Sequence, residues 1–413
     1  MAGTVQLQSS GPRGNEFTIN PEYSYFHGVY KKSQHLSVFS RELNAETKPD
    51  FNKIIKFVIP QNCGTFLTKL SLKVKLPGIH TPDICYIESV GHAIIEHAKL
   101  YIGGELIQYI PSDYLQIYSE HNVSLTHQYS LEERIGKYPI RVNTVPVSDK
   151  RILAHTNIGK DGVDVEMIAE LPFYFYKHPE LALPISSIDK QLIEVEIKLR
   201  DYKQLLTDIN GTYPIVDIDQ GSLLDATLST ELILTEKNTR DNQDYIITQI
   251  QENVFQLDEG EDEKKVVLDL VNPVKELYFV IQREGVSPFD YDNSEAFIDD
   301  TYILYENLKK LKLKFNDQVM ISGKVGNVQF LKAVQGRIHH TRTQLIRRFY
   351  SYSFALKPEE WYPTGQINFS LIKNKILEIE LFRCIPPTSR KLKVYALSYN
   401  TLRLCKGTMK LIY

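Results

Sequence analysis

Apolar and polar residues alternate with a period of two in several segments of this chain. The clearest are residues 70–76, 193–199, 311–315 and 377–381, which read LSLKVKL, IEVEIKL, LKLKF and LEIEL. Successive side chains of a β-strand point to opposite faces, so this pattern predicts strands with one face in a core and the other in solvent. The continuous apolar run at 277–281 predicts a strand covered on both faces.

Helical periodicity is short by comparison. The candidates are residues 112–118, which Ser112 could cap, and residues 328–334. Strand patterns separated by Gly, Pro, Asn and Asp are typical of sandwiches and barrels, whereas βαβ units need longer helical segments. The sequence therefore predicts an all-β protein with short helices in its loops.

Composition and length support a large β protein. The 413 residues include 25 Tyr and 18 Phe, and 42% of the chain is hydrophobic, which is enough for a substantial core. That length predicts two or three domains, or two large β domains. The formal net charge of -3 provides no basic field, so specific nucleic-acid binding is not expected.

The cysteines and the N-terminus indicate where the chain folds. Four scattered cysteines are too few for a disulfide framework or a paired-cysteine zinc site. Residues 1–20 do not resemble a signal peptide, and no run approaches 18 consecutive apolar residues. We therefore expect synthesis and folding in the cytosol, and no membrane-spanning helix.

Two pairs of segments repeat along the chain in the same order. Residues 99–107 and 312–320 both read as a strand, a two-residue turn and a second strand. Residues 173–180 (FYFYKHPE) and 352–359 (YSFALKPE) are also alike, and each precedes one of the alternating strands. This order predicts two similar β domains in tandem.

The join between the two domains is predicted in the polar stretch at 235–242. We therefore divide the chain into an N-terminal arm at 1–22, a first β domain at 23–238 and a second β domain at 239–413. Each β domain has a suitable size for one sandwich.

Motifs for catalysis or cofactor binding are missing from the sequence. It contains no phosphate-binding loop, no Gly-x-Ser-x-Gly elbow and no His-Glu-x-x-His pair. The nearest candidate for a metal cluster is His92, Glu96 and His97, which we interpret as structural because the spacing of the two histidines on a strand would place them on opposite faces. No catalytic, cofactor-binding or metal-binding residue is predicted, and no cofactor is expected.

The most basic stretch spans residues 337–348 and contains His339 and His340. It lacks the interleaved aromatic residues of a base-stacking surface. We therefore predict a solvated loop or a subunit contact at this stretch, in preference to a nucleic-acid site.

Two other functions are left open by the residues. A two-sandwich carbohydrate-binding protein could use Tyr-rich loops as stacking surfaces. A glycoside hydrolase would need two carboxylates on separate strands, which leave no local motif.

A combination of motifs after residue 350 is more specific. Together with residues 102–107 and 171–175, it resembles the major capsid proteins of nucleocytoplasmic large DNA viruses, the group that includes iridoviruses and phycodnaviruses. The residues that carry this resemblance are Tyr352, Phe354, Pro358, Glu359, Pro363, Gly365, Asn368, Phe369, Tyr399, Asn400, Leu402, Arg403 and Gly407.

The resemblance implies a double jelly roll, in which two eight-stranded antiparallel sandwiches follow each other in one chain. It further implies a homotrimer without enzymatic activity that forms a pseudo-hexagonal capsomer of an icosahedral virion, assembled in the host cytoplasm. Its partners would be neighbouring capsomers and, through the arm at 1–22, minor capsid proteins and an internal membrane. A minor capsid protein or a virophage relative of the same fold is the alternative.

The resemblance also implies structural roles for single residues. Pro358 and Pro363 would direct the backbone toward Gly365, where a positive φ is allowed. Asn368 would satisfy backbone groups in a turn, and Arg403 would pair with a carboxylate. The loop at 283–305, with Asp290, Tyr291 and Asp292 at its centre, is the predicted exposed loop that could meet a host surface.

Overall fold

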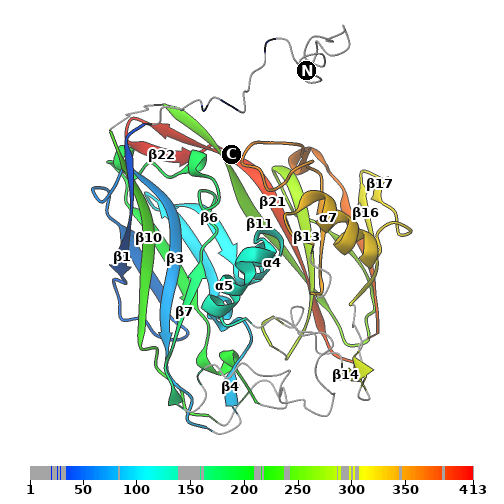
Figure 1. Ribbon diagram of the computed structural model, residues 1–413. Coiled ribbons are helices and arrows are strands. Elements are labelled where there is room, and N and C mark those ends of the chain that lie inside the picture. Colours follow the sequence, from blue (N-terminus) through cyan, green and yellow to red (C-terminus); the bar gives the residue numbers. More distant parts are fainter. Residues whose placement is uncertain are drawn as a thin grey trace, which may run out of the picture. The chain divides into compact units, whose positions relative to one another are not determined.

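The computed structural model describes most of the chain beyond residue 33 (Figure 1). The described ranges are 34–81, 84–137, 162–208, 218–236, 242–285, 287–289, 297–298, 301–302, 307–343, 347–383 and 387–412, with single positions at 20, 26, 28, 159 and 215. The chain divides into two compact units, Met1–Leu36 and Ser37–Tyr413, and the sheets belong to the second, apart from their first residue, Leu36. Within these ranges, no helix is long and apolar enough to cross a membrane.

The first half of the chain forms a sandwich of two four-stranded antiparallel sheets. One sheet has the order β1-β10-β3-β7 and the other the order β2-β8-β5-β6. The strands in chain order are β1 (Leu36–Asn44), β2 (Ile54–Ile59), β3 (Phe66–Leu76), β5 (Ile95–Ile102), β6 (Glu105–Pro111), β7 (Val165–Glu170), β8 (Ile193–Leu199) and β10 (Asp225–Thr235).

The second half repeats this arrangement with sheets of order β11-β21-β13-β18 and β12-β20-β16-β17. These strands are β11 (Gln243–Leu257), β12 (Glu263–Val267), β13 (Pro273–Arg283), β16 (Leu308–Phe315), β17 (Gln318–Ile321), β18 (Phe349–Ser353), β20 (Lys375–Leu381) and β21 (Arg390–Cys405). Short strands β19 (Ile367–Asn368) and β22 (Thr408–Leu411) pair with β13 and β21.

Small elements lie between the strands within each half of the chain. They are the strand pairs β4 (Ile84–Tyr86) with β9 (Leu206–Asp208) and β14 (Phe297–Ile298) with β15 (Thr301–Tyr302), and the helical segments α3 (Val90–Ala93), α4 (Ser112–Asn122), α5 (Leu125–Ile135), η2 (Pro179–Leu181), η3 (Ile185–Ser187), η4 (Tyr202–Leu205), η5 (Gln329–Val334), α7 (Gln335–His339) and η6 (Phe369–Leu371).

Both halves follow the same jelly-roll connection. Chain order and sheet position match strand for strand, so that β5 and β6 of the first half correspond to β16 and β17 of the second. The predicted repeat at 99–107 and 312–320 forms these two equivalent hairpins. A double jelly roll, expected from the resemblance, is therefore the fold of this chain.

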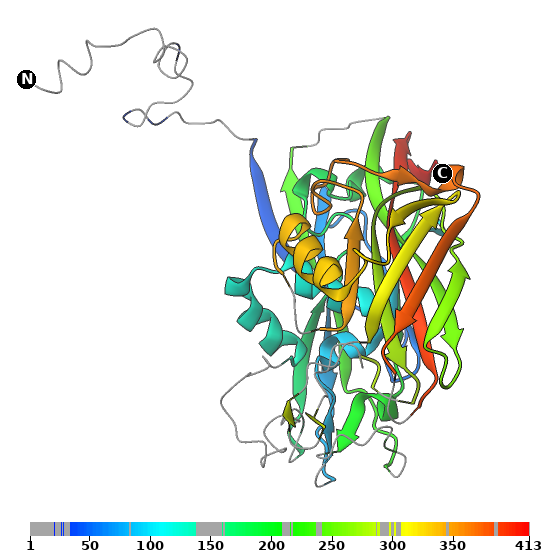
Figure 2. The ribbon, with the colours of Figure 1, turned by 90° about the vertical axis from the view of Figure 1, so that its right-hand side faces the viewer.

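The helices are longer than their periodicity predicted. Ser112 is the first residue of α4 and not its cap, because Pro111 is at the N-cap position, and a second helix, α5, follows directly. After β17, η5 continues into α7 beyond the predicted end at 334. Figures 1 and 2 show α4, α5 and α7 outside the sheets, all on one face of the molecule.

The two jelly rolls share buried surface through the sheet that contains β13. Leu277, Phe279 and Ile281 point into the core of the second jelly roll. Tyr278 and Val280, on the opposite face of the same strand, belong to the core of the first. The prediction of a strand covered on both faces is confirmed, and the outer face of this sheet fastens the two sandwiches together.

The C-terminal hairpin makes a second connection between the jelly rolls. Lys406 and Gly407, with φ values of 48° and 81°, form the turn between β21 and β22. Beyond the turn, the Met409 amide donates to Gln191 Oε1 at 2.6 Å, and the Met409 side chain is buried in the first core. The end of the second jelly roll is thus anchored on the loop before β8 of the first.

Candidate functional site at the junction of the jelly rolls

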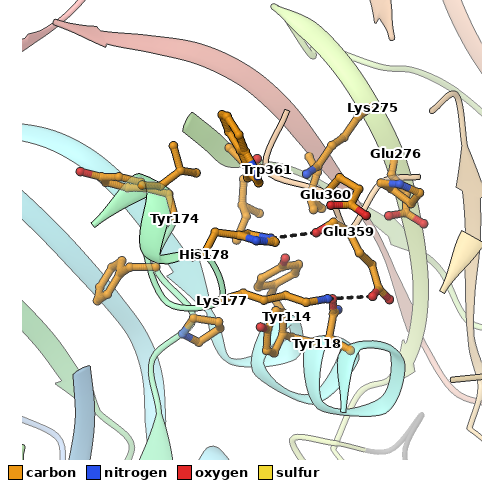
Figure 3. Close-up of a pocket in the computed structure, with 18 of the residues that line it drawn as sticks. Tyr114, Tyr118, Tyr174, Lys177, His178, Lys275, Glu276, Glu359, Glu360 and Trp361 are labelled. Atoms are coloured by element: carbon orange, nitrogen blue, oxygen red, sulfur yellow. Dashed lines mark hydrogen bonds and ion pairs between the residues drawn. The ribbon is translucent and has the colours of Figure 1, made fainter. Parts of the chain in front are cut away.

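A cavity of about 70 Å³ lies at the junction of the jelly rolls (Figure 3). Residues of α4 and of the segment after β7 line it from the first jelly roll, and residues of β13 and of the segment after β18 line it from the second. The lining includes Tyr114, Tyr118, Lys177, His178, Lys275, Glu276, His340, Glu359, Glu360 and Trp361.

The second repeated sequence pair meets at this cavity. Lys177 and His178 come from the copy at 173–180, and Glu359 ends the copy at 352–359. Lys177 Nζ donates to Glu359 Oε2 at 2.8 Å, and His178 Nε2 donates to the Glu359 carbonyl oxygen at 2.9 Å. Equivalent loops of the two jelly rolls therefore bind each other directly.

His340 joins the buried carboxylate of Glu276 to the partly buried carboxylate of Glu359 in the cavity lining. Its Nε2 lies 2.7 Å from Glu276 Oε1 and its Nδ1 lies 3.3 Å from Glu359 Oε1. Burial alone would lower the pKa of His340, but the two carboxylates outweigh it and raise that pKa to about 9. His340 is therefore an imidazolium at neutral pH, and both of its ring nitrogens donate hydrogen bonds.

His121 of α4 stacks on this imidazolium. The two ring centroids are 3.9 Å apart, with 30° between the planes. Burial, reinforced by the charge of His340, lowers the pKa of His121 to about 3. The stack thus pairs a neutral ring from the first jelly roll with a charged ring from the second.

A second buried ionic cluster surrounds Glu120 of α4. The Glu120 carboxylate contacts Lys137 of its own jelly roll, and it lies 3.4 Å from Arg347 Nε and 3.1 Å from Arg342 Nη2 of the other. Burial would raise the pKa of Glu120, but these three cations lower it to about 2. Arg347 also reaches Glu88, at 3.2 Å.

The prediction of a solvated loop at 337–348 is wrong for Arg347, Arg348 and the His340 side chain, whereas Arg337, Ile338, Thr341 and Thr343 are exposed. Arg347 and Arg348 are only 5% and 3% exposed, and Arg342 donates its backbone N–H to the His121 carbonyl. The buried Glu120 carboxylate of α4 pairs with Arg342 and Arg347 of this stretch. Residues 344–346 lie outside the described part of the chain.

A third polar contact links α4 to β21. Asp113 accepts hydrogen bonds from Lys393 Nζ and from the Tyr395 hydroxyl, both at 2.6 Å. One helix of the first jelly roll thus presents Asp113, Glu120 and His121 to the second. Sequence reasoning missed these residues because no local motif marks them, although the basic stretch at 337–348 signalled that acidic partners were needed.

The cavity chemistry does not match a glycosidase. Burial would raise the pKa values of Glu276 and Glu359, but hydrogen bonds and charge from His340 lower both, that of Glu359 to about 2. A general acid of this class requires a raised pKa. These carboxylates are instead held ionised by their cationic partners.

The described residues contain no group of three or more His, Cys, Asp and Glu side chains that could hold a metal ion. His92 is in α3 and not on a strand with His97 as predicted, and its Nδ1 lies 2.9 Å from Gln116 Oε1. Cys63 and Cys405 are free thiols.

The motif residues before 370 lie in the second core and beside the cavity. Tyr352, Phe354 and Phe369 form a ring cluster, in which the Phe354 centroid is 5.2 Å from that of Tyr352 and 5.9 Å from that of Phe369. Pro358 and Glu359 line the cavity. Further along, Pro363 is exposed, and Asn368 Oδ1 accepts from the Ser370 amide at 3.0 Å.

The motif residues after 398 follow β21 into its hairpin. Asn400 Nδ2 donates to Gln249 Oε1 at 2.8 Å, and Leu402 is buried in the first core. Arg403 forms two hydrogen bonds, of 2.7 and 2.8 Å, with the carboxylate of Asp244 on the exposed face of β11. The predicted exposed residues Asp290, Tyr291 and Asp292 lie outside the described residues.

Gly365 occupies a backbone position that excludes a side chain. Its φ is 144°, and a Cβ atom would lie 2.8 Å from the Phe354 carbonyl oxygen. We expect Gly365→Ala to lower the free energy of unfolding by about 2 kcal/mol, because it combines backbone strain with a backbone collision. Urea denaturation monitored by fluorescence gives this value.

The matched control for Gly365 is Gly104 in the β5–β6 turn. Its φ is also positive, at 81°, but nothing lies within 4 Å of an added Cβ. Gly104→Ala should cost about 1 kcal/mol from strain alone. Equal losses for both variants would show that the collision at Gly365 is relieved at no cost.

Two known protein families match the sequence of this chain. Residues 24–233 match the family of the major capsid protein N-terminus, and residues 236–410 match the large eukaryotic DNA virus major capsid protein. The chain belongs to the major capsid proteins of large eukaryotic DNA viruses. The two matches cover one jelly roll each, in agreement with the duplicated topology.

Relatives of this capsid protein extend along its whole length. It is 26% identical to the major capsid protein of Pyramimonas orientalis virus, over 100% of this chain and 99% of the relative. It is 21% identical to the major capsid protein of Paramecium bursaria Chlorella virus 1, with the same two shares.

Solved capsid structures share the fold. A chain of the PBCV-1 virus capsid superimposes with a TM-score of 0.75 at 17% identity, covering 94% of this chain and 100% of that one. The Faustovirus major capsid protein gives a TM-score of 0.70 at 14% identity, covering 97% and 96%. The homologues are structural proteins of virions.

Proposed function

We propose that this capsid protein assembles as a homotrimer into pseudo-hexagonal capsomers that tile an icosahedral shell. The observation that carries the proposal is the strand-for-strand repetition of the jelly roll. Three copies of a chain with two equivalent sandwiches present six similar wedges around one axis, and closed cyclic symmetry is the common outcome for like subunits.

The junction supports this role because it makes the two jelly rolls one rigid body. The shared core around Tyr278 and Val280 and the buried clusters at Glu120 and His340 leave few degrees of freedom between the sandwiches. A fixed angle between wedges is what a hexagonal outline requires. We therefore infer that the interface between the two jelly rolls fixes the shape of the subunit for assembly.

Further parts of the proposal concern the residues at the ends and in the loops. We propose a first domain at 23–238 and a second at 239–413, with the arm at 1–22 contacting minor capsid proteins and an internal membrane. The loop at Asp290, Tyr291 and Asp292 is proposed to face outward toward the host surface, and assembly is proposed to occur in the host cytoplasm.

Light scattering coupled to size-exclusion chromatography tests the trimer. We expect a mass of three times 47.7 kDa that persists through a dilution series. Persistence follows from the large interfaces of obligate oligomers. A chain that remains monomeric at high concentration would contradict the proposed homotrimer.

A further inference from the structure

Lys275 is a buried cation that forms no ion pair with a described residue. It lies on β13, is 5% exposed and extends into the junction cavity, which Glu360 and Trp361 also line (Figure 3). The structure gives its ammonium no hydrogen bond or ion pair with any described residue. Its one close contact is with the ring of Tyr399, whose centroid is 5.3 Å from Nζ.

The nearby carboxylates are already engaged elsewhere. Glu276 accepts from His340 and from the Tyr278 hydroxyl, and Glu359 accepts from His340, Lys177 and Thr341. Their charges act on the Lys275 ammonium from a distance, but neither carboxylate accepts a hydrogen bond from it. A buried ammonium whose hydrogen bonds are unmet is costly. Burial lowers the pKa of Lys275 to about 8, so it is still largely charged at neutral pH.

We propose that the junction cavity binds a single carboxylate group through the Lys275 ammonium. A carboxylate forms strong charge-assisted hydrogen bonds with an ammonium. The phenols of Tyr114 and Tyr118, which make no hydrogen bond to a described residue, line the same cavity and supply further donors. Glu276, Glu359 and Glu360 also line it, so a group with one negative charge is favoured over a doubly charged phosphate.

The carboxylate can come from two sources. It can belong to a free monocarboxylate such as acetate, or to an acidic side chain or C-terminus of a neighbouring capsid chain. The second source rests on the proposed assembly, whereas the first does not. The size of the cavity, about 70 Å³, suits a small group and not a large metabolite.

Reductive methylation of the purified full-length protein, with mass-spectrometric detection of each lysine, tests the site. We expect 100 mM acetate to slow methylation of Lys275 at least fivefold relative to 100 mM chloride. Lys332 is the internal control, because it is 3% exposed and contacts a tyrosine ring at 5.6 Å but does not line the cavity. Its rate should be equal in both salts.

Assembled particles distinguish the two sources. Protection of Lys275 on assembly without acetate would identify a neighbouring chain as the donor. Protection by acetate in a chain that stays monomeric would support the site and contradict the trimer. Equal rates of Lys275 methylation in acetate, in chloride and after assembly would overturn the proposal. The ammonium would then be hydrated and bind no carboxylate.

Two variants give an independent readout. In the wild-type protein, acetate should raise Tm by about 2 °C over chloride, since a ligand that binds only the folded state stabilises it. Lys275→Met should abolish this increase, and the control Lys332→Met should retain it. If Lys275→Met does not fold, the methylation rates of the wild-type chain still decide the question.

Discussion

Replacing Glu120 with glutamine is expected to lower the free energy of unfolding by about 3 to 5 kcal/mol. The substitution keeps the shape of the side chain and removes its charge. Lys137 and Arg347, whose side chains are 2% and 6% exposed, would then be buried cations without their shared carboxylate. Urea denaturation of the purified protein measures the loss.

A half-buried carboxylate with two exposed lysine partners provides the control. Glu380 on β20 contacts Lys309 and Lys310, whose side chains are 47% and 54% exposed. Solvent screens such pairs, so Glu380→Gln should lower the free energy of unfolding far less than Glu120→Gln. If Glu120→Gln cost no more than this control, the buried cluster would not be what holds α4 to the second jelly roll.

Stability is expected to fall as the pH rises from 6.5 to 8.5 because of His340. The pKa of His340 is about 9 in the folded protein, above the usual value near 6.5. A raised pKa stabilises the fold fully below the unfolded pKa, and this contribution is lost as the pH rises through the folded value. Over two pH units the loss is about 2 to 3 kcal/mol.

Comparison with the His340→Gln variant isolates the contribution of His340 to the pH dependence of stability. The titratable groups that face His340 are Glu276, Tyr278 and Glu359 from its own jelly roll and His121 from α4. The urea midpoint of the wild-type protein should fall between pH 6.5 and 8.5, and that of the variant should fall much less. Parallel pH profiles would mean that His340 is not held as an imidazolium in the fold.

His121 affects the stability of the fold at acid pH. Its pKa of about 3 lies below the unfolded value, so protonation favours unfolding as the pH drops below about 6.5. The stacked pair therefore favours a junction that is strongest near neutral pH. Stability falls on both sides of neutral pH because the pKa of His340 is raised and that of the stacked His121 is lowered.

Much of the fold was predictable from local patterns. Alternation at 70–76 and 193–199 marked β3 and β8, and the apolar run at 277–281 marked a strand buried on both faces. The repeats at 99–107 and 312–320 indicated a duplication that the strand order confirms. These features are readable because side-chain direction in a strand depends only on sequence parity.

The junction was not predictable in the same way. Glu120 and Arg347 are 227 positions apart, and Lys177 and Glu359 are 182 apart, so no local spacing links either pair. The basic stretch at 337–348 looked solvated because its charges have no acidic neighbours along the chain. Arg342 and Arg347 pair with Glu120 on α4 of the other jelly roll. His340 pairs with Glu276 and Glu359 of its own.

The sequence by itself determined that this chain forms two similar β-sandwiches, and its motifs after residue 350 indicated the capsid family. Only the tertiary structure decided that Arg347 and Arg348 are buried, that His121 and His340 are held at opposite protonation states, and that Lys275 faces a cavity. The physical reason is that strand patterns record burial of single residues, whereas pairing of buried charges depends on which distant segments packing brings together.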